Sequence, residues 1–214
     1  MNRSVIRQRL MVYCGLILCI TVVGQNQTKV IGKSEYPGYA NVSGLPEFAV
    51  KSNLLYGGLA LAPNLAVEFG TSTKTSLVLF GSYNPWDGDS ETNKKMKHFV
   101  VKTELRYWLC ERFNGHFFGF HPFYTEYNVS GHKIPTLFEK EYRYEGFAVG
   151  AGLSYGYHWI LNHRWSLEAT LGAGYAYFEY AKFPCEKCGE KMGDFSKHYF
   201  GPTQLGVSLI YIIK

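Results

Sequence analysis

Four long segments of this chain alternate between two kinds of side chain, and this alternation constrains the fold most. Residues 99–109, 147–161, 165–177 and 205–213 place large apolar or aromatic side chains at every second position. The positions between them hold mostly Gly, Ala, Ser or charged residues. A period of two is typical of β-strands, whereas an amphipathic helix repeats every three to four residues. The chain is therefore predicted to be all-β.

The character of the two faces favours a membrane barrel over a soluble one. A secreted ligand-binding barrel of the lipocalin kind would need a polar exterior, whereas the face that is not apolar is here small and Gly-rich, which suits a narrow lumen. Aromatic residues such as Tyr155, Trp159, Trp165 and Tyr175 gather toward strand ends, as in the girdles at two membrane interfaces. Charged residues make up only 18% of the chain, against about 25% in ordinary soluble domains.

The lengths of the connections support the same class. Strands are predicted at 51–61, 65–69, 75–83, 98–109, 116–127, 144–161, 164–180 and 199–213. The connections 84–97, 128–143 and 181–198 are long and polar, while 70–74, 110–115 and 162–163 are short. Long and short connections thus alternate, as they do in outer-membrane barrels. We expect an eight-stranded antiparallel up-and-down transmembrane β-barrel.

The N-terminus has the three parts of a secretory signal peptide. Arg3, Arg7 and Arg9 precede an apolar run over 10–23, and Val22 and Gly24 supply a small-residue cleavage site. The alternative, a membrane anchor, would need about 20 apolar residues. The expected organisation is a signal peptide at 1–24, a short N-terminal linker at 25–49 and the barrel domain at 50–214. A signal peptide followed by a transmembrane barrel predicts location in the outer membrane of a Gram-negative bacterium.

If the apolar faces point outward, a set of polar and charged residues points into the lumen. Buried charges must be paired, and Glu68 and Glu168 are the expected partners of Lys102 and Arg106. Such pairs fill small barrels as a structural plug, and a gated ion path is the functional alternative. The predicted lumen network consists of Glu68, Lys102, Glu104, Arg106, His158, Glu168 and Gln204.

No motif in the sequence predicts catalysis. Cys185 and Cys188 form a C-x-x-C pair in the last long connection, and in an oxidising compartment they are expected to form a local disulfide. A redox site would need a βαβ context, and a metal site would need more ligands than the nearby His198. A lipid-modifying barrel enzyme would need a nucleophile and a base on the outer rim, and no such set can be assembled. We therefore expect no cofactor and no metal.

Several runs resemble a family of small outer-membrane β-barrel proteins of unknown function from Gram-negative anaerobes. The runs that carry the resemblance are 83–86 (YNPW), 105–111 (LRYWLCE), 113–119 (FNGHFFG), 150–157 (GAGLSYGY) and 201–203 (GPT). The resemblance covers about residues 50–214. It implies the barrel fold and the outer-membrane location, and members are often thought to accompany fimbria-like surface systems. The family has no established activity, so it implies no catalytic residues.

The predicted function is a structural or surface-binding role through the long loops. These loops mix both signs of charge with apolar residues such as Trp86, Leu137 and Phe195, which suits contact with an extracellular protein or glycan. Outer-membrane lipid is the expected surrounding, and the chain is expected to be a monomer. Beyond residues 1–24 the basic and acidic residues nearly balance, so a nucleic-acid partner is not expected. The alternatives are the lipid-modifying enzyme and a narrow ion-conducting barrel.

Overall fold

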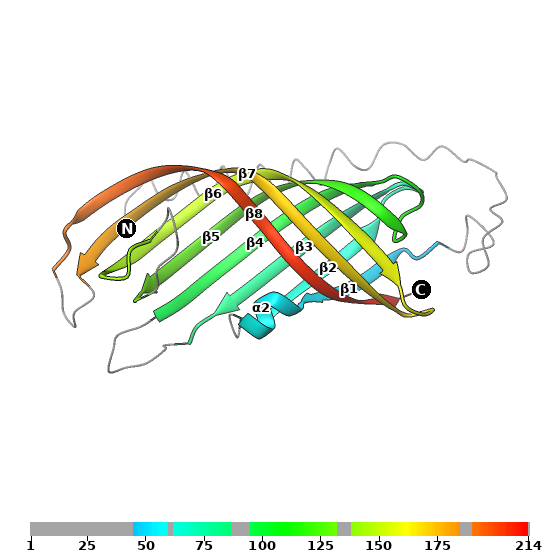
Figure 1. Cartoon of the computed structure of the whole chain (residues 1–214), viewed down its shortest axis with the longest axis horizontal. Helices are drawn as coiled ribbons and strands as arrows, with labels where there is room; N and C mark the ends of the chain where they lie inside the picture. The colour runs from blue at the N-terminus through cyan, green and yellow to red at the C-terminus, as the bar shows by residue number, and fades with distance from the viewer. Residues whose placement is uncertain (1–44, 60–61, 87–94, 132–137, 185–189, 214) are drawn as a thin grey trace.

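The chain folds into one antiparallel sheet that closes into a barrel. The computed structural model describes residues 45–59, 62–86, 95–131, 138–184 and 190–213. Within these residues, eight strands pair in sequence order from β1 to β8, and β8 returns to β1 (Figure 1). The elements are β1 (Phe48–Asn53), α2 (Leu54–Leu59), β2 (Asn64–Gly70), β3 (Thr75–Asn84), β4 (Lys95–Trp108), β5 (Gly115–Ser130), β6 (Tyr142–Ile160), β7 (Trp165–Pro184) and β8 (Gly193–Ile213). The predicted all-β, eight-stranded, up-and-down topology is confirmed.

The described part of the chain contains no helix with the length and apolarity that a membrane crossing requires.

The height of the barrel wall rises steadily around its circumference. β1 has 6 residues, β4 has 14 and β8 has 21. β7 and β8 pair from Trp165↔Tyr211 to Lys182↔Gly193, whereas β1 and β8 pair only from Phe48↔Ile213 to Asn53↔Ser208. Where the last strand meets the first, the wall therefore drops from its longest strand, β8, to its shortest, β1 (Figure 1).

The predicted first strand, 51–61, was wrong at both ends. β1 begins at Phe48, inside the predicted linker 25–49, and it ends at Asn53, where α2 begins. The Asn53 side chain starts the helix, because its Oδ1 accepts a hydrogen bond 3.0 Å long from the backbone N–H of Leu55. The predicted signal peptide, 1–24, and most of the predicted linker lie outside the described residues.

The strands next to the long connections reach further than the alternation predicted. β7 continues to Pro184 and β8 begins at Gly193, so much of the predicted connection 181–198 is paired sheet. Tyr180 of β7 stacks on Phe195 of β8, with 6.0 Å between ring centroids. Where both faces of a sheet meet water, the side chains no longer need to alternate, so the sequence signal ends before the ladder does.

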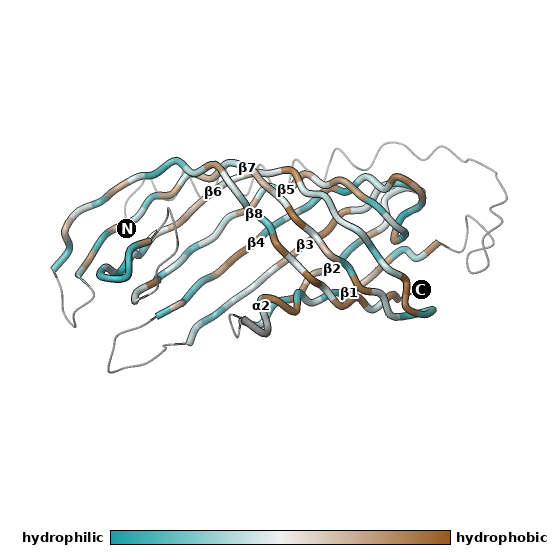
Figure 2. Tube along the Cα trace, in the orientation of Figure 1, coloured by the Kyte–Doolittle hydropathy of each residue, from teal (hydrophilic) through white to brown (hydrophobic). Residues whose placement is uncertain are grey.

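The two surfaces of the barrel have the predicted polarity. Leu153 is 70% exposed and Leu171 is 60% exposed on the outside, while Glu68, Arg106 and Glu168 are buried. Figure 2 shows the resulting change of hydropathy along each strand. At the end with the short turns, an apolar cluster closes the interior. It consists of Ala49, Trp108, Phe113, Phe117, Ile210 and Ile212.

Candidate functional site

Arg106 of β4 lies at the centre of the charged lumen. Its Nη1 donates to Glu168 Oε2 at 2.6 Å and to Glu68 Oε2 at 3.3 Å. Its Nη2 donates to Glu168 Oε1 at 3.0 Å and to Glu104 Oε2 at 2.8 Å. The guanidinium also lies 4.1 Å from the ring centroid of Phe117. One cation thus joins strands β2, β4 and β7, and its predicted pairing with Glu68 and Glu168 is present.

Lys51 of β1 is a second cation in this network, and the sequence reasoning missed it. Its Nζ lies 2.6 Å from Glu68 Oε2 and 3.5 Å from Glu168 Oε2. The predicted strand 51–61 contained Lys51, but it was assigned no inward face, because that segment showed no clean alternation. The available signal was parity: Ala49 and Lys51 are the buried, inward positions of β1.

Neutral side chains satisfy the remaining carboxylate oxygens. Ser76 donates to Glu68 Oε1 at 2.5 Å, and Trp108 Nε1 donates in turn to Ser76 Oγ at 2.8 Å. Ser154 donates to Glu104 Oε1, and Gln204 Nε2 lies 3.4 Å from the same oxygen. The network therefore has few spare acceptors, as buried charges require.

Lys102 does not make its predicted pair with Glu68 or Glu168. Within the described residues it forms no ion pair, and its Nζ lies 5.1 Å from the ring centroid of Phe80. Lys102 is four residues from Arg106 on β4, which is about 13 Å along a strand at 3.3 Å per residue. Lys102 therefore lies closer to the long connections than the three carboxylates do.

Two histidines point inward, and parity predicted this for His158. His158 lies beside the network, with Nδ1 3.8 Å from Glu168 Oε2 and its ring 5.7 Å from that of Trp108. His121 is fully buried, and its Nε2 lies 2.9 Å from Thr203 Oγ1. Neither histidine lies beside a nucleophile and an acid in the arrangement that a hydrolase needs.

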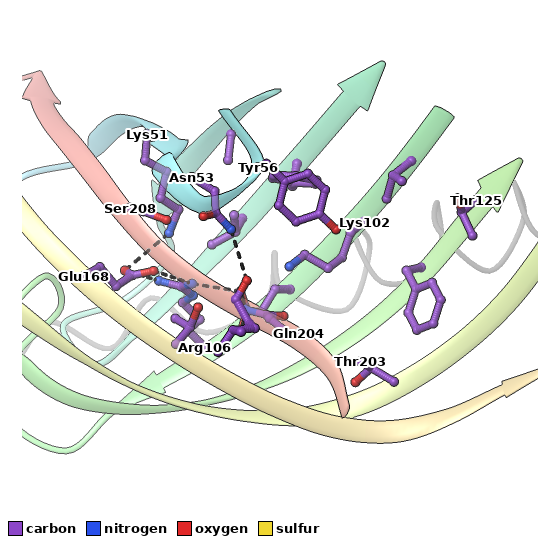
Figure 3. A pocket seen from close by; sticks show the side chains of 18 residues that line it. Lys51, Asn53, Tyr56, Lys102, Arg106, Thr125, Glu168, Thr203, Gln204 and Ser208 are labelled. Atoms are coloured by element: carbon purple, nitrogen blue, oxygen red, sulfur yellow. Dashed lines mark hydrogen bonds and ion pairs between the residues drawn. The ribbon is translucent and has the colours of Figure 1, made fainter. Parts of the chain in front are cut away.

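A cavity of about 200 Å³ lies beside the network, on the side away from the short turns (Figure 3). Arg106 and Glu168 border it on the side of the network, and Lys102 points into it. Glu104 is also one of its lining residues. Tyr56 of α2 and Gln204 of β8 also border it. The charged site is thus closed toward the short turns and has free space on its other side.

The remaining predicted sites give no further centre. Cys185 and Cys188 lie outside the described residues. Cys110 is an exposed, free thiol next to the end of β4, at the short turns. No group of three potential metal ligands occurs among the residues that the structure describes.

Comparison with known proteins identifies a family and no activity. Residues 14–213 match a family described as protein of unknown function (DUF3575). No curated protein and no solved structure matches the chain.

Proposed function

The chain belongs to the DUF3575 family of proteins of unknown function, and we propose that it is a small outer-membrane β-barrel with a plugged lumen. In this proposal it has a structural or surface-binding role through its long loops, and it carries out no catalysis. It is exported by a signal peptide at 1–24 to the outer membrane of a Gram-negative bacterium, and it is a monomer.

The observation that carries the proposal is the inverted polarity of the barrel. Glu68, Glu104, Arg106 and Glu168 are 0–2% exposed in the interior, while Leu153, Leu171 and Leu205 are 60–70% exposed outside. In water, these exposed apolar side chains would be unfavourably hydrated, whereas in a bilayer the lipid chains would cover them. A closed sheet also satisfies its own backbone hydrogen bonds, which hydrocarbon demands.

The interior supports a plug rather than an ion path. Arg106 ties three strands together across the lumen, and Trp108, Phe113 and Phe117 close the end below it. The backbone φ of Phe113 is 62°, and its ring lies 5.9 Å from that of Trp108. A non-glycine residue in this left-handed conformation is unusual, so the surrounding cluster holds the turn in place.

The rim at the long connections supports a binding role. Tyr127, Val129, Phe138, Tyr144 and Ala148 form a buried cluster there, and Phe178 and Tyr180 pack against it. This cluster makes the ends of β5, β6 and β7 a firm base for the loops. Loops on a rigid scaffold are where binding usually resides, and the partner class proposed here is an extracellular protein or glycan.

Fractionation and gel migration test the proposal together. We expect the protein in the outer-membrane fraction, and we expect its migration in SDS to change on boiling. In planar bilayers the folded protein should give no stable conductance steps. Recovery in the soluble periplasm would disprove the membrane location, and regular conductance steps would replace the plug with the ion-path alternative.

A further inference from the structure

A groove of about 450 Å³ lies on the outside of the barrel wall, where β3, β4, β5 and β6 approach the long connections (Figure 1). Tyr83, Phe99, Glu126 and Phe147 line it. These four residues form one row across the four strands, because Tyr83 pairs with Phe99, Phe99 with Glu126 and Glu126 with Phe147. Phe147 is six positions before the exposed Leu153 on β6. Since every second residue of a strand shares a face, the row faces outward.

The row marks the limit of the apolar outer surface toward the long connections. Over 99–107 on β4 and 147–159 on β6, the outward positions carry no charged side chain. The next outward position on each strand carries one, Lys97 on β4 and Glu145 on β6. Charged side chains are costly in hydrocarbon, and aromatic rings gather at the membrane interface. In the proposed membrane location, the groove therefore lies at the boundary between lipid and the external medium.

The aromatic rings of the row suit the apolar face of a sugar ring. Tyr83 and Phe99 are 58% and 40% exposed, and the ring of Phe147 stacks on that of Tyr124, with 6.1 Å between centroids. A pyranose carries C–H groups on its faces and hydroxyls at its edge, so it can lie flat on such rings while its edge forms hydrogen bonds. Adjacent strands are about 4.8 Å apart, so the row from Tyr83 to Phe147 spans about 14 Å, which is longer than a single sugar ring.

Carboxylates lie between and beside these rings. Glu126 separates Phe99 from Phe147 in the row, and the Tyr124 hydroxyl donates to Glu126 Oε1 at 2.7 Å. Glu145 also lines the groove, and its side chain is 53% exposed. Ionised carboxylates accept hydrogen bonds and donate none, so both glutamates suit the hydroxyl donors of a sugar.

This composition favours a glycan over a protein, and a neutral glycan over an anionic one. The centre of a protein–protein interface is depleted in charged residues, whereas here a carboxylate lies within the row of rings. Phosphate and sulfate groups are recognised by Arg and Lys. Among the described residues that line the groove, the ammonium of Lys97 is outnumbered by the carboxylates of Glu126 and Glu145. An anionic chain would therefore be disfavoured.

We propose that this groove binds a neutral extracellular polysaccharide, whose sugar rings stack on Tyr83, Phe99 and Phe147 and whose hydroxyls donate to Glu126 and Glu145. This inference rests on the proposed function, which exposes this end of the barrel to the medium. It assigns the surface-binding role one class of partner and places the contact on the barrel wall beside the loops.

Saturation-transfer NMR on the purified, folded protein tests the inference. The detergent is lauryldimethylamine oxide, which has no sugar headgroup. The probes are maltohexaose, cellohexaose, mannohexaose and chitohexaose, with a heparin hexasaccharide as the anionic comparison. We expect saturable binding of at least one neutral probe and none of heparin. If no neutral probe binds, or if heparin binds as tightly as the best of them, the inference is overturned.

One pair of variants locates the binding. Tyr83→Ala should lower affinity for the bound probe about tenfold or more, as expected for an aromatic residue central to an interface. The matched control is Phe118→Ala, because Phe118 is 52% exposed on the outer face near the short turns, and its binding should not change. Equal losses in both variants would overturn the assignment to the groove.

Glu126→Gln keeps the test decisive if Tyr83→Ala does not fold. It retains the size of the side chain and should still weaken binding, because a neutral amide forms weaker hydrogen bonds with hydroxyls than a carboxylate does. Unchanged affinity in Glu126→Gln would overturn the role of the carboxylate. Binding of purified lipopolysaccharide without binding of any neutral probe would mean that the groove holds a membrane glycolipid, and it would overturn the inference as well.

The outcomes separate the two proposals. A heat-modifiable protein in the outer-membrane fraction that binds no neutral probe would overturn the glycan groove and leave the proposed function standing. Recovery of the protein in the soluble periplasm would overturn the proposed function, and with it the exposure of the groove to the medium.

Discussion

Arg106 and Glu168 face each other across the lumen and form two hydrogen bonds, 2.6 Å and 3.0 Å long. The two residues are 62 positions apart in the sequence, on strands β4 and β7, which do not pair with each other. Because Arg106 also contacts Glu68 and Glu104, this bidentate pair is the point at which the opposite walls of the barrel are joined.

Removing the charge of Arg106 should destabilise the barrel strongly. Arg106→Met leaves Lys51 to pair with Glu68 and Glu168 and leaves Glu104 without an ion pair among the described residues. Breaking a buried pair costs about 3–5 kcal/mol. Arg106→Lys should cost less, because it keeps the charge and loses the fork geometry. Urea unfolding in lipid vesicles, followed by tryptophan fluorescence, measures both. Lys191→Met is the control, since Lys191 and Asp194 form an exposed pair worth about 0–1 kcal/mol; equal losses at both sites would contradict the network.

An arginine on the outer face should be penalised by lipid. Leu153 and Leu171 lie in the middle of their strands and are 70% and 60% exposed. Leu153→Arg or Leu171→Arg should cost about 2–4 kcal/mol near the bilayer midplane. Folding yield in vesicles, compared with yield in detergent, measures the effect. If Leu171→Arg folds in vesicles as well as the wild type does, the outer face is not in lipid.

A methyl group at Gly152 should overfill the lumen. A Cβ there would lie 2.6 Å from Thr203 Oγ1, 2.7 Å from His121 Nε2 and 2.8 Å from the Ala173 carbonyl. Gly152→Ala should therefore lower stability, by about 1–3 kcal/mol as overpacking usually does. Gly81→Ala is the matched control, because a Cβ at Gly81 meets nothing within 4 Å. The comparison uses the same unfolding assay, and a larger loss at Gly81 would contradict the packing described.

Cys110 provides a test of orientation. Its thiol is free and exposed at the end with the short turns, which the proposed function places in the periplasm. In a Cys185→Ser, Cys188→Ser background, a membrane-impermeant maleimide should label Cys110 only after the outer membrane is permeabilised. Labelling of intact cells would mean that the barrel is inserted the other way round.

Protease treatment of intact cells tests the opposite end. The connections 85–94 and 185–192 join strands at the end opposite Cys110, and the proposal exposes them to the medium. Cleavage should occur in these connections and spare the turn at 161–164. Cleavage at 161–164 while the long connections remain intact would contradict the assignment.

Most of the fold could be predicted because long strands repeat their signal many times. β6 and β7 are 19 and 20 residues long, and their side chains alternate over 147–161 and 165–177, so single exceptions such as Ala151 do not obscure the period. β1 offered only six residues, and the helix after it depends on a cap by Asn53 that the pattern does not reveal. Short elements of this kind are decided by one or two local contacts rather than by periodicity.

The lumen residues could be predicted by parity, but their partners could not. Parity places Lys102 and Arg106 on the inner face of β4, and both lie there. Which of them reaches Glu168 depends on how far each strand is shifted along its neighbour, and that shift is fixed by all seven hairpins together. To predict that Lys51 pairs with Glu68, the correct bounds of β1 would have been required as well.

The graded strand lengths also set an order in which the barrel assembles. β7 and β8 are neighbours in sequence and share a long ladder, from Trp165↔Tyr211 to Lys182↔Gly193, so their pairing closes a short loop and gains many hydrogen bonds. The β1–β8 ladder joins the two ends of the domain through only six residue pairs, so a short ladder must offset the largest entropy cost of loop closure in the barrel. Pairing is therefore expected to proceed from the C-terminal hairpin toward the N-terminus, with β1 the last strand to join and the first to leave.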